Sequence, residues 1–206
     1  MAIIRPFLVW DAHLTERLSS MIELLTNAEM GECDRLTIAG GTPGIVLMEN
    51  AGRVVADAAA ARAPANGKVV VVAGPGNNGG DGFVTARLLA ERNFAVELLL
   101  VGEAAKLKGD AAEAAHRWLG AVVPASPERV GRPAMIVDAL FGAGLDRSVE
   151  GLPRAMIEAM NAAGCPIVAV DLASEVNGTT GAVMGVAVNA VESVTFFRGP
   201  LRNACG

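Results

Sequence analysis

The chain has 206 residues, of which 52% are hydrophobic, and a formal net charge of −5. This composition is typical of a folded domain with a full core and argues against an intrinsically disordered chain. The acidic balance, without a block of basic residues, argues against nucleic acid as a partner, and no apolar run approaches the roughly 20 residues of a membrane span.

The first residues predict neither a secretory signal nor a regular element. Arg5 and Pro6 interrupt the apolar stretch, and no small-residue cleavage site follows. Because residues 1–23 show no clear period, we expect an N-terminal extension followed by one domain over residues 24–206. Three widely separated cysteines predict free thiols in a reducing compartment, and thus a cytoplasmic protein (Cys33, Cys165, Cys205).

Two helices are predicted next in the chain. Thr26 or Asn27 can cap the first, and Glu29 lies in its first turn. The pair Gly40-Gly41 ends this helix. The apolar spacing from residue 43 onward predicts a second helix, which ends before Pro64.

The rest of the chain alternates between apolar runs and helical segments. Continuous β-branched runs of this kind are typical of strands buried on both faces of a parallel sheet. The predicted strands are KVVVVAG (68–74), AVELLLVG (95–102), VVP (122–124), AMIVDALFG (134–142), PIVAVDL (166–172) and SVTFF (193–197). Helices are predicted over 80–93, 108–121 and 152–164. The expected fold is therefore a three-layer αβα, Rossmann-like domain with a mostly parallel sheet and helices on both faces.

Three predicted strands end in polar, glycine-rich loops, GPGNNGGDG (74–82), VDALFGAGLDRS (137–148) and VDLASEVNGTTG (170–181). In open α/β sheets, ligands bind beyond the carboxyl ends of the strands where the strand order switches. If the first strand lies beside the fourth, these loops converge, and Asn78, Asp138, Asp171 and Ser174 face one another. Glycines that open onto a helix suit a phosphate, and amide, carboxylate and hydroxyl oxygens suit a hard cation. A shell with few charges favours a monovalent ion.

The first loop also contains G-x-G-x-x-G in Gly74, Gly76 and Gly79. The dinucleotide fingerprint requires an acidic residue about 20 positions later, at the end of the second strand. Glu97 lies near the start of that strand and Glu103 falls a few residues late, so an NAD(P) oxidoreductase is weakly supported. Plain tight turns and solvated strand-end aspartates are the structural alternatives for these loops.

Several segments resemble the NAD(P)H-hydrate epimerases, the YjeF N-terminal domain family. The resemblance rests on GPGNNGGDGFVTARLL (74–89), VDALFGAGL (137–145) and VAVDLAS (168–174), and on two leading helices, TNAEMGECDR (26–35) and GIVLMENAGR (44–53). It spans roughly residues 24–197. The family has a three-layer Rossmann-like fold, interconverts the R and S epimers of hydrated NADH and NADPH (NADHX and NADPHX) in nucleotide repair, and binds potassium.

The resemblance implies specific roles for residues at matching positions. Asp171 would contact the substrate and act as the catalytic acid–base residue. K⁺ would be bound by Asn78, Asp138 and Ser174. The other substrate-binding residues would form two loops: Asn77, Asn78, Gly79, Gly80 and Asp81, and Gly142, Ala143, Gly144, Leu145, Asp146, Arg147 and Ser148. The implied partners are the small-molecule substrate NAD(P)HX, a second copy in a homodimer, and an ADP- or ATP-dependent NAD(P)HX dehydratase.

The sequence departs from the family pattern at three places. Ala173-Ser174-Glu175 stands where Pro-Ser-Gly is usual, which we expect to bring a carboxylate to the ion. Ala143 replaces the usual threonine, and the segment after the last Phe pair lacks the common Lys-Pro-Gly. Two other functions stay open: a non-catalytic interaction module, which the retained Asp138 and Asp171 disfavour, and the oxidoreductase.

Overall fold

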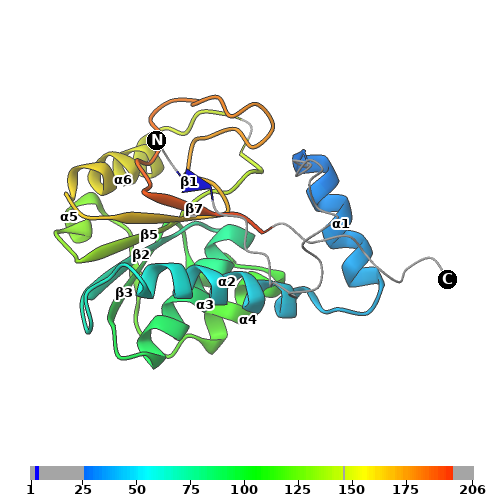
Figure 1. Ribbon diagram of the computed structural model, residues 1–206, viewed down its shortest axis with the longest axis horizontal. Coiled ribbons are helices and arrows are strands. Elements are labelled where there is room, and N and C mark those ends of the chain that lie inside the picture. The colour runs from blue at the N-terminus through cyan, green and yellow to red at the C-terminus, as the bar shows by residue number, and fades with distance from the viewer. Residues whose placement is uncertain (1–2, 5–25, 146, 197–206) are drawn as a thin grey trace, which may run out of the picture.

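The computed structural model describes residues 3–4, 26–145 and 147–196, and seven strands form one sheet (Figure 1). The strand order is β1-β7-β6-β5-β2-β3-β4, and every neighbouring pair is parallel. The strands are β1 (Ile3–Ile4), β2 (Lys68–Ala73), β3 (Ala95–Leu100), β4 (Val122–Pro124), β5 (Met135–Ala139), β6 (Ile167–Val170) and β7 (Glu192–Val194).

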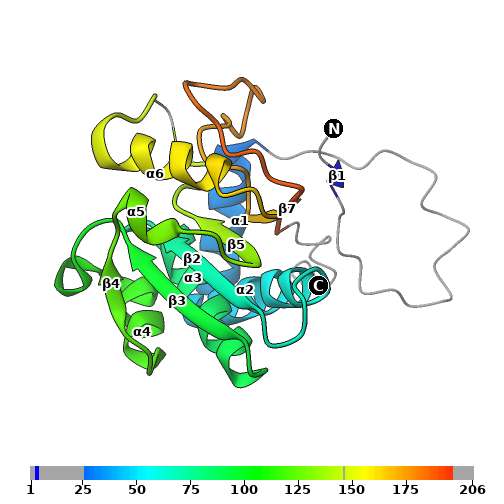
Figure 2. The same ribbon diagram turned by 90° about the vertical axis from the view of Figure 1, so that its left-hand side faces the viewer.

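Helices cover both faces of this sheet, which confirms the three-layer prediction (Figure 2). The helical elements are α1 (Asn27–Ala39), α2 (Gly44–Ala60), α3 (Asn77–Glu91), η1 (Ala104–Lys106), α4 (Gly109–Arg117), α5 (Pro127–Val130) and α6 (Gly151–Ala162). Within β2, Val69 and Val71 pack toward α2, α3 and α4, while Val70 and Val72 pack toward α5 and α6. Successive side chains of a strand point to opposite faces, so the buried residues of β2, which follow the exposed Lys68, are all apolar.

The strand order switches at β2. From β2 the chain proceeds outward through β3 and β4, and β5, β6 and β7 then lie on the other side of β2. The predicted adjacency of the first and fourth strands is confirmed, because β2 pairs with β5 in the register Val72 to Asp138. Ligand sites in such sheets form beyond the carboxyl ends of the strands at this switch.

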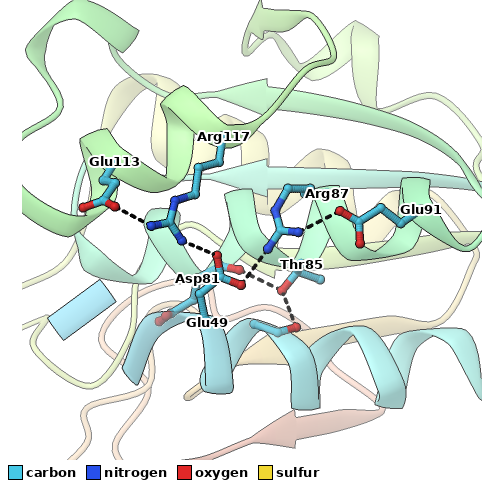
Figure 3. A network of polar contacts seen from close by, with 8 residues as sticks. Glu49, Asp81, Thr85, Arg87, Glu91, Glu113 and Arg117 are labelled. Atoms are coloured by element: carbon cyan, nitrogen blue, oxygen red, sulfur yellow. Dashed lines mark hydrogen bonds and ion pairs between the residues drawn. The ribbon is translucent and has the colours of Figure 1, made fainter. Parts of the chain in front are cut away.

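Close packing and an ion-pair network join α2, α3 and α4. A Cβ on Gly52 of α2 would lie 2.6 Å from the Cβ of Val84, so only glycine allows this approach of α2 to α3. Glu49 pairs with Arg87 of α3 at 2.6 Å and with Arg117 of α4 at 2.9 Å (Figure 3). These contacts fix the helices that carry one wall of the site.

Helix α1 stands apart from the layered body, and none of its residues is buried (Figure 1). Its predicted start is confirmed as a capping box: the backbone N–H of Thr26 donates to Glu29 Oε2 at 2.8 Å, and that of Glu29 donates to Thr26 Oγ1. Within the described ranges, no helix is both long and apolar enough to cross a bilayer.

Candidate functional site

A pocket of about 880 Å³ opens at the strand-order switch. The segments that follow β2, β5 and β6 contribute to it, and residues of α1 and α2 form another wall. Four carboxylates line this pocket, those of Asp34, Asp81, Asp110 and Asp171. The three predicted loops therefore do converge, and the leading helices join them.

Asp171 lies directly after β6 and is held in one orientation. Its Oδ2 accepts a hydrogen bond from the backbone N–H of Ala143 at 2.8 Å, and its own N–H donates to the carbonyl of Val194 at 2.8 Å. Its φ of 63° is left-handed, a region that aspartate and asparagine tolerate better than most residues. Burial raises the pKa of Asp171, the Ala143 hydrogen bond opposes this, and the charge of Asp34 raises it further.

The asparagine segment differs from the prediction. We expected residues 77–81 to form a loop before a helix starting near residue 80, but α3 already begins at Asn77, with Gly76 as its N-cap. The first turn of α3 therefore faces the pocket, where its leading backbone N–H groups lack intrahelical partners. Gly79 and Gly80 lie in this part of the helix, and because glycine is common in loops, the sequence of the segment resembles a loop.

The residues of this first turn divide between pocket and core. Asn77, Asn78 and Asp81 line the pocket, whereas Gly79 and Gly80 are buried inside. A Cβ on Gly80 would lie 2.6 Å from the Cε of Met48, so this glycine serves helix packing. Burial first, and then the negative charges of Asp171 and Asp34, raise the pKa of Asp81 well above its ordinary value.

Asp138 and Ser174 form a buried cluster next to Phe141, and neither is among the residues that line the pocket. Asp138 lies within β5 and is fully buried, and its Oδ1 accepts from the Ser174 hydroxyl at 2.7 Å. Its carboxylate also accepts from the backbone N–H groups of Ser174 at 2.9 Å and Leu140 at 3.2 Å. Burial raises the pKa of Asp138 to about 6 despite these hydrogen bonds, which favour the charged form.

Asn78, the third predicted ion ligand, lies at the pocket wall. The position that a Cβ would take on Gly142 is 2.9 Å from Asn78 Oδ1 and 2.8 Å from Asp171 Oδ2. Asn78 Nδ2 is buried and has no hydrogen-bond partner among the described residues. Glycine at 142 thus allows the asparagine and the aspartate to approach the same point.

The second predicted loop reaches the pocket only in part. Residues 142–145 line it, as predicted for Gly142, Ala143, Gly144 and Leu145. Asp146 lies outside the described residues. Arg147 and Ser148 are exposed and are not part of the pocket lining, and the Ser148 hydroxyl donates to the carbonyl of Met184.

Glu175 does not bring its carboxylate to the predicted ion site, contrary to our expectation. Its Oε2 accepts from the backbone N–H of Val186 at 2.8 Å, and its Oε1 accepts from that of Val149. Its φ is 69°, the left-handed conformation that the usual glycine adopts without strain. The backbone of Ser174 therefore keeps the geometry needed for Asp138, and the added side chain turns elsewhere.

Sequence reasoning missed the contribution of α1. Asn27 Nδ2 donates to the carbonyl of Ala143, and Asp34 lines the pocket. The rule that ligands bind at the carboxyl ends of strands says nothing about a helix such as α1, which stands beside the sheet and reaches the pocket from there. Resemblance to the leading helices was the one signal in the sequence for this wall.

Comparison with known proteins places this architecture in a family. Residues 44–199 match the family model described as YjeF-related protein N-terminus. The chain belongs to this family. It is 44% identical over 177 residues to an NAD(P)H-hydrate epimerase of Limosilactobacillus fermentum, covering 84% of this chain and 85% of that one.

Two further matches define the extent of this YjeF-related domain. A bifunctional NAD(P)H-hydrate repair enzyme Nnr of Thermofilum pendens is 41% identical over 161 residues, which cover 73% of this chain but 31% of that protein. The crystal structure of yeast ynu0 superposes with a TM-score of 0.76 at 24% identity, covering 84% of this chain and 80% of that one. Because its identity is 24%, the match to the yeast structure supports the fold alone.

Proposed function

We propose that this YjeF-related domain interconverts the R and S epimers of hydrated NADH and NADPH. The observation that carries the proposal is Asp171, fixed by Ala143 at the carboxyl end of β6, facing a pocket large enough for a nucleotide. Burial and the charge of Asp34 raise its pKa, which makes the protonated form more available for proton transfer than in an ordinary aspartate. Relatives of similar length that bear the name NAD(P)H-hydrate epimerase support the same reaction.

Asp171 can serve either chemical route to inversion. The substrate carries a hydroxyl on C6 of the reduced ring, next to the ring nitrogen. In one route, protonated Asp171 gives its proton to this hydroxyl, the C–O bond breaks and water departs, which forms an iminium ion. Water then adds to the opposite face of this ion and returns a proton to Asp171. In the other, Asp171 takes the hydroxyl proton, the C6–N bond breaks to an aldehyde, and the nitrogen gains a proton before the ring recloses. Both routes need one group that gives and takes a proton at this oxygen.

The direct test is incubation of the purified protein with a single NADHX epimer, followed by chromatography. We expect the other epimer to appear until both reach equilibrium, without formation of NAD⁺. In a separate incubation with NADH and a carbonyl acceptor, formation of NAD⁺ would indicate the oxidoreductase instead. An unchanged single epimer would favour the non-catalytic interaction module.

Asp34→Asn should move the Asp171-controlled limb of the pH–rate profile to lower pH. The negative charge of Asp34 helps to raise the pKa of Asp171, so its removal makes ionisation of Asp171 easier. The measurement is kcat/KM against pH for both proteins. Asp110→Asn is the matched control, because Asp110 lines the same pocket next to Gly44, and it should move the limb less. An unshifted limb in Asp34→Asn would contradict the assignment.

We also propose K⁺ as the resident ion. The available donors are oxygens, which fit a hard monovalent cation: Asn78 Oδ1, the Asp138 carboxylate, Ser174 Oγ, and the carbonyl of Phe141, 3.1 Å from Ser174 Oγ. When bound, the ion would supply positive charge toward the substrate diphosphate. The residues themselves hold the loop at Phe141, whose N–H donates to Ser174 Oγ at 3.0 Å.

Replacing K⁺ with tetramethylammonium should lower the melting temperature of the wild-type protein by a few degrees. An ion that binds only the folded state at about ten times its Kd stabilises that state by about 1.4 kcal/mol. Scanning calorimetry in the two salts measures the shift, and Asp138→Asn should abolish most of it. Equal melting temperatures of the wild type in both salts would count against the site.

The remaining proposals concern partners and location. The leading helices carry the exposed apolar side chains of Leu36, Ile38 and Val46, which support a homodimer through this surface. Analytical ultracentrifugation tests this association.

A dehydratase that acts on one epimer would consume the product, and the bifunctional repair enzyme among the relatives supports such a pairing. We propose a cytoplasmic location, which fractionation tests.

A further inference from the structure

Glu175 is a buried acidic side chain for which the proposed chemistry has no use. It is 1% exposed and adopts a φ of 69°, a conformation that strains most residues other than glycine. Strained residues persist where the surrounding structure compensates for them, and they cluster at functional sites. The bonds of the Glu175 carboxylate show what compensates here.

The carboxylate joins two segments that are distant in sequence. One oxygen accepts from the N–H of Val149, which follows the second substrate loop, and the other accepts from Val186 at 2.8 Å. The Glu175 carbonyl also accepts from the N–H of Met184 at 2.9 Å. The side chain occupies the space beside Gly185, where a Cβ would lie 2.2 Å from Oε2. Hydrogen bonds from backbone N–H groups to a buried carboxylate are stronger than those between neutral groups.

Ser174 and Glu175 together grip the same loop at both ends. Phe141, directly before Gly142, donates its N–H to Ser174 Oγ at 3.0 Å. Val149, on the far side of the loop, donates to Glu175. Two adjacent residues after β6 therefore fix where the loop starts and where it ends. The pocket-lining residues 142–145, including the Ala143 amide that holds Asp171, lie between these two anchors.

We propose that Glu175 is a positioning residue that preorganises the second substrate loop and so raises affinity for the substrate. This role rests on the proposed epimerase function of the pocket. A loop that is ordered before binding loses less conformational freedom when the substrate arrives. When Glu175 is changed, Asp171 keeps its backbone hydrogen bond to Val194, and Ser174 still holds Phe141 at the end of the loop nearest Ala143, so the chemistry should be affected less than binding.

The test is Glu175→Gly, with Glu175→Gln as a second variant. We expect Glu175→Gly to raise KM by about tenfold and to change kcat by about twofold or less. The glycine relieves the strained φ, so the melting temperature should change little. Glutamine offers one oxygen in place of two, and should give an intermediate KM. Hydrogen exchange of peptides covering 142–149, measured without substrate, should be faster in Glu175→Gly than in the wild type.

Asn161→Ala is the matched control. Asn161 of α6 also ties the segment after Glu175 through two hydrogen bonds, donating to the carbonyl of Ala187 at 2.9 Å and accepting from Asn189 at 2.8 Å. Both of these hydrogen bonds go to the segment after Glu175 and neither goes to the substrate loop, so their loss should lower the melting temperature and leave KM unchanged.

Two results would overturn the proposal: an unchanged KM with unchanged exchange in Glu175→Gly, or a fall in kcat at constant KM. If the wild type does not interconvert the epimers, the proposed epimerase function is rejected. Hydrogen exchange of residues 142–149 in the wild type and in Glu175→Gly then tests by itself whether Glu175 orders the loop. If Glu175→Gly does not fold, Glu175→Gln decides in the same assays, and a wild-type KM in it would overturn the proposal.

Discussion

Asp171→Asn should lower the rate of epimerisation by about 10²- to 10⁴-fold while the protein stays folded. Asparagine retains an oxygen that can accept from the Ala143 N–H, and it tolerates the φ of 63°. It cannot give and take a proton at neutral pH, which is the function assigned to this carboxyl. The comparison uses initial rates of conversion of a single NADHX epimer, with melting temperatures measured in parallel.

Asp171→Ala separates the chemical loss from a structural one. Alanine removes the acceptor for Ala143 and adopts left-handed φ values less readily than aspartate. We therefore expect a similar loss of rate together with a lower melting temperature. Turnover of Asp171→Asn at the wild-type rate would exclude Asp171 as the proton-transferring group, whatever the behaviour of the alanine variant.

The parts of the fold that could be predicted are those with a strong period or a completely apolar run. β2 begins at Lys68, ends before Gly74 and is buried on both faces after its first residue, so its sequence alone identifies it. By contrast, β1 has two residues and α5 has four, too few for a period. The sequence predicts a start of α3 near residue 80, later than the observed Asn77, because its first turns contain Gly79 and Gly80 and glycine has a low helix propensity.

The site was predicted as far as strand topology determines it. Asp171 and residues 142–145 follow neighbouring strands, and parallel pairing brings them to one edge. Asp34 comes from α1, whose position depends on side-chain contacts such as that of Asn27 with Ala143. The direction of the Glu175 side chain follows from its left-handed backbone, and no residue pattern in the sequence predicts that conformation at a glutamate.

Alanine at Gly79 or Gly74 should destabilise the protein severely, whereas alanine at Gly76 should not. A Cβ on Gly79 would lie 1.9 Å from the carbonyl oxygen of Gly74, and a Cβ on Gly74 would lie 1.9 Å from that of Leu140. Both obstacles are backbone atoms, so relief requires α3 to move away from the end of β2 in one variant, and the ends of β2 and β5 to separate in the other. We expect a loss of about 3 kcal/mol in the free energy of unfolding for either variant, measured by urea denaturation.

Gly76→Ala is the control within the same G-x-G-x-x-G. No atom lies within 4 Å of a Cβ on Gly76, and its φ of −106° is open to alanine. Because Gly76 is the N-cap of α3, Gly76→Ala should lower the free energy of unfolding by about 1 kcal/mol or less. Equal destabilisation by all three substitutions would contradict this division.

If the division holds, the first and third glycines bring the end of β2 and the start of α3 against neighbouring backbone, while the second lines the pocket. The letters shared with the dinucleotide fingerprint would then reflect tight strand–helix packing, and substrate choice would rest on the side chains between and after them, Asn77, Asn78 and Asp81.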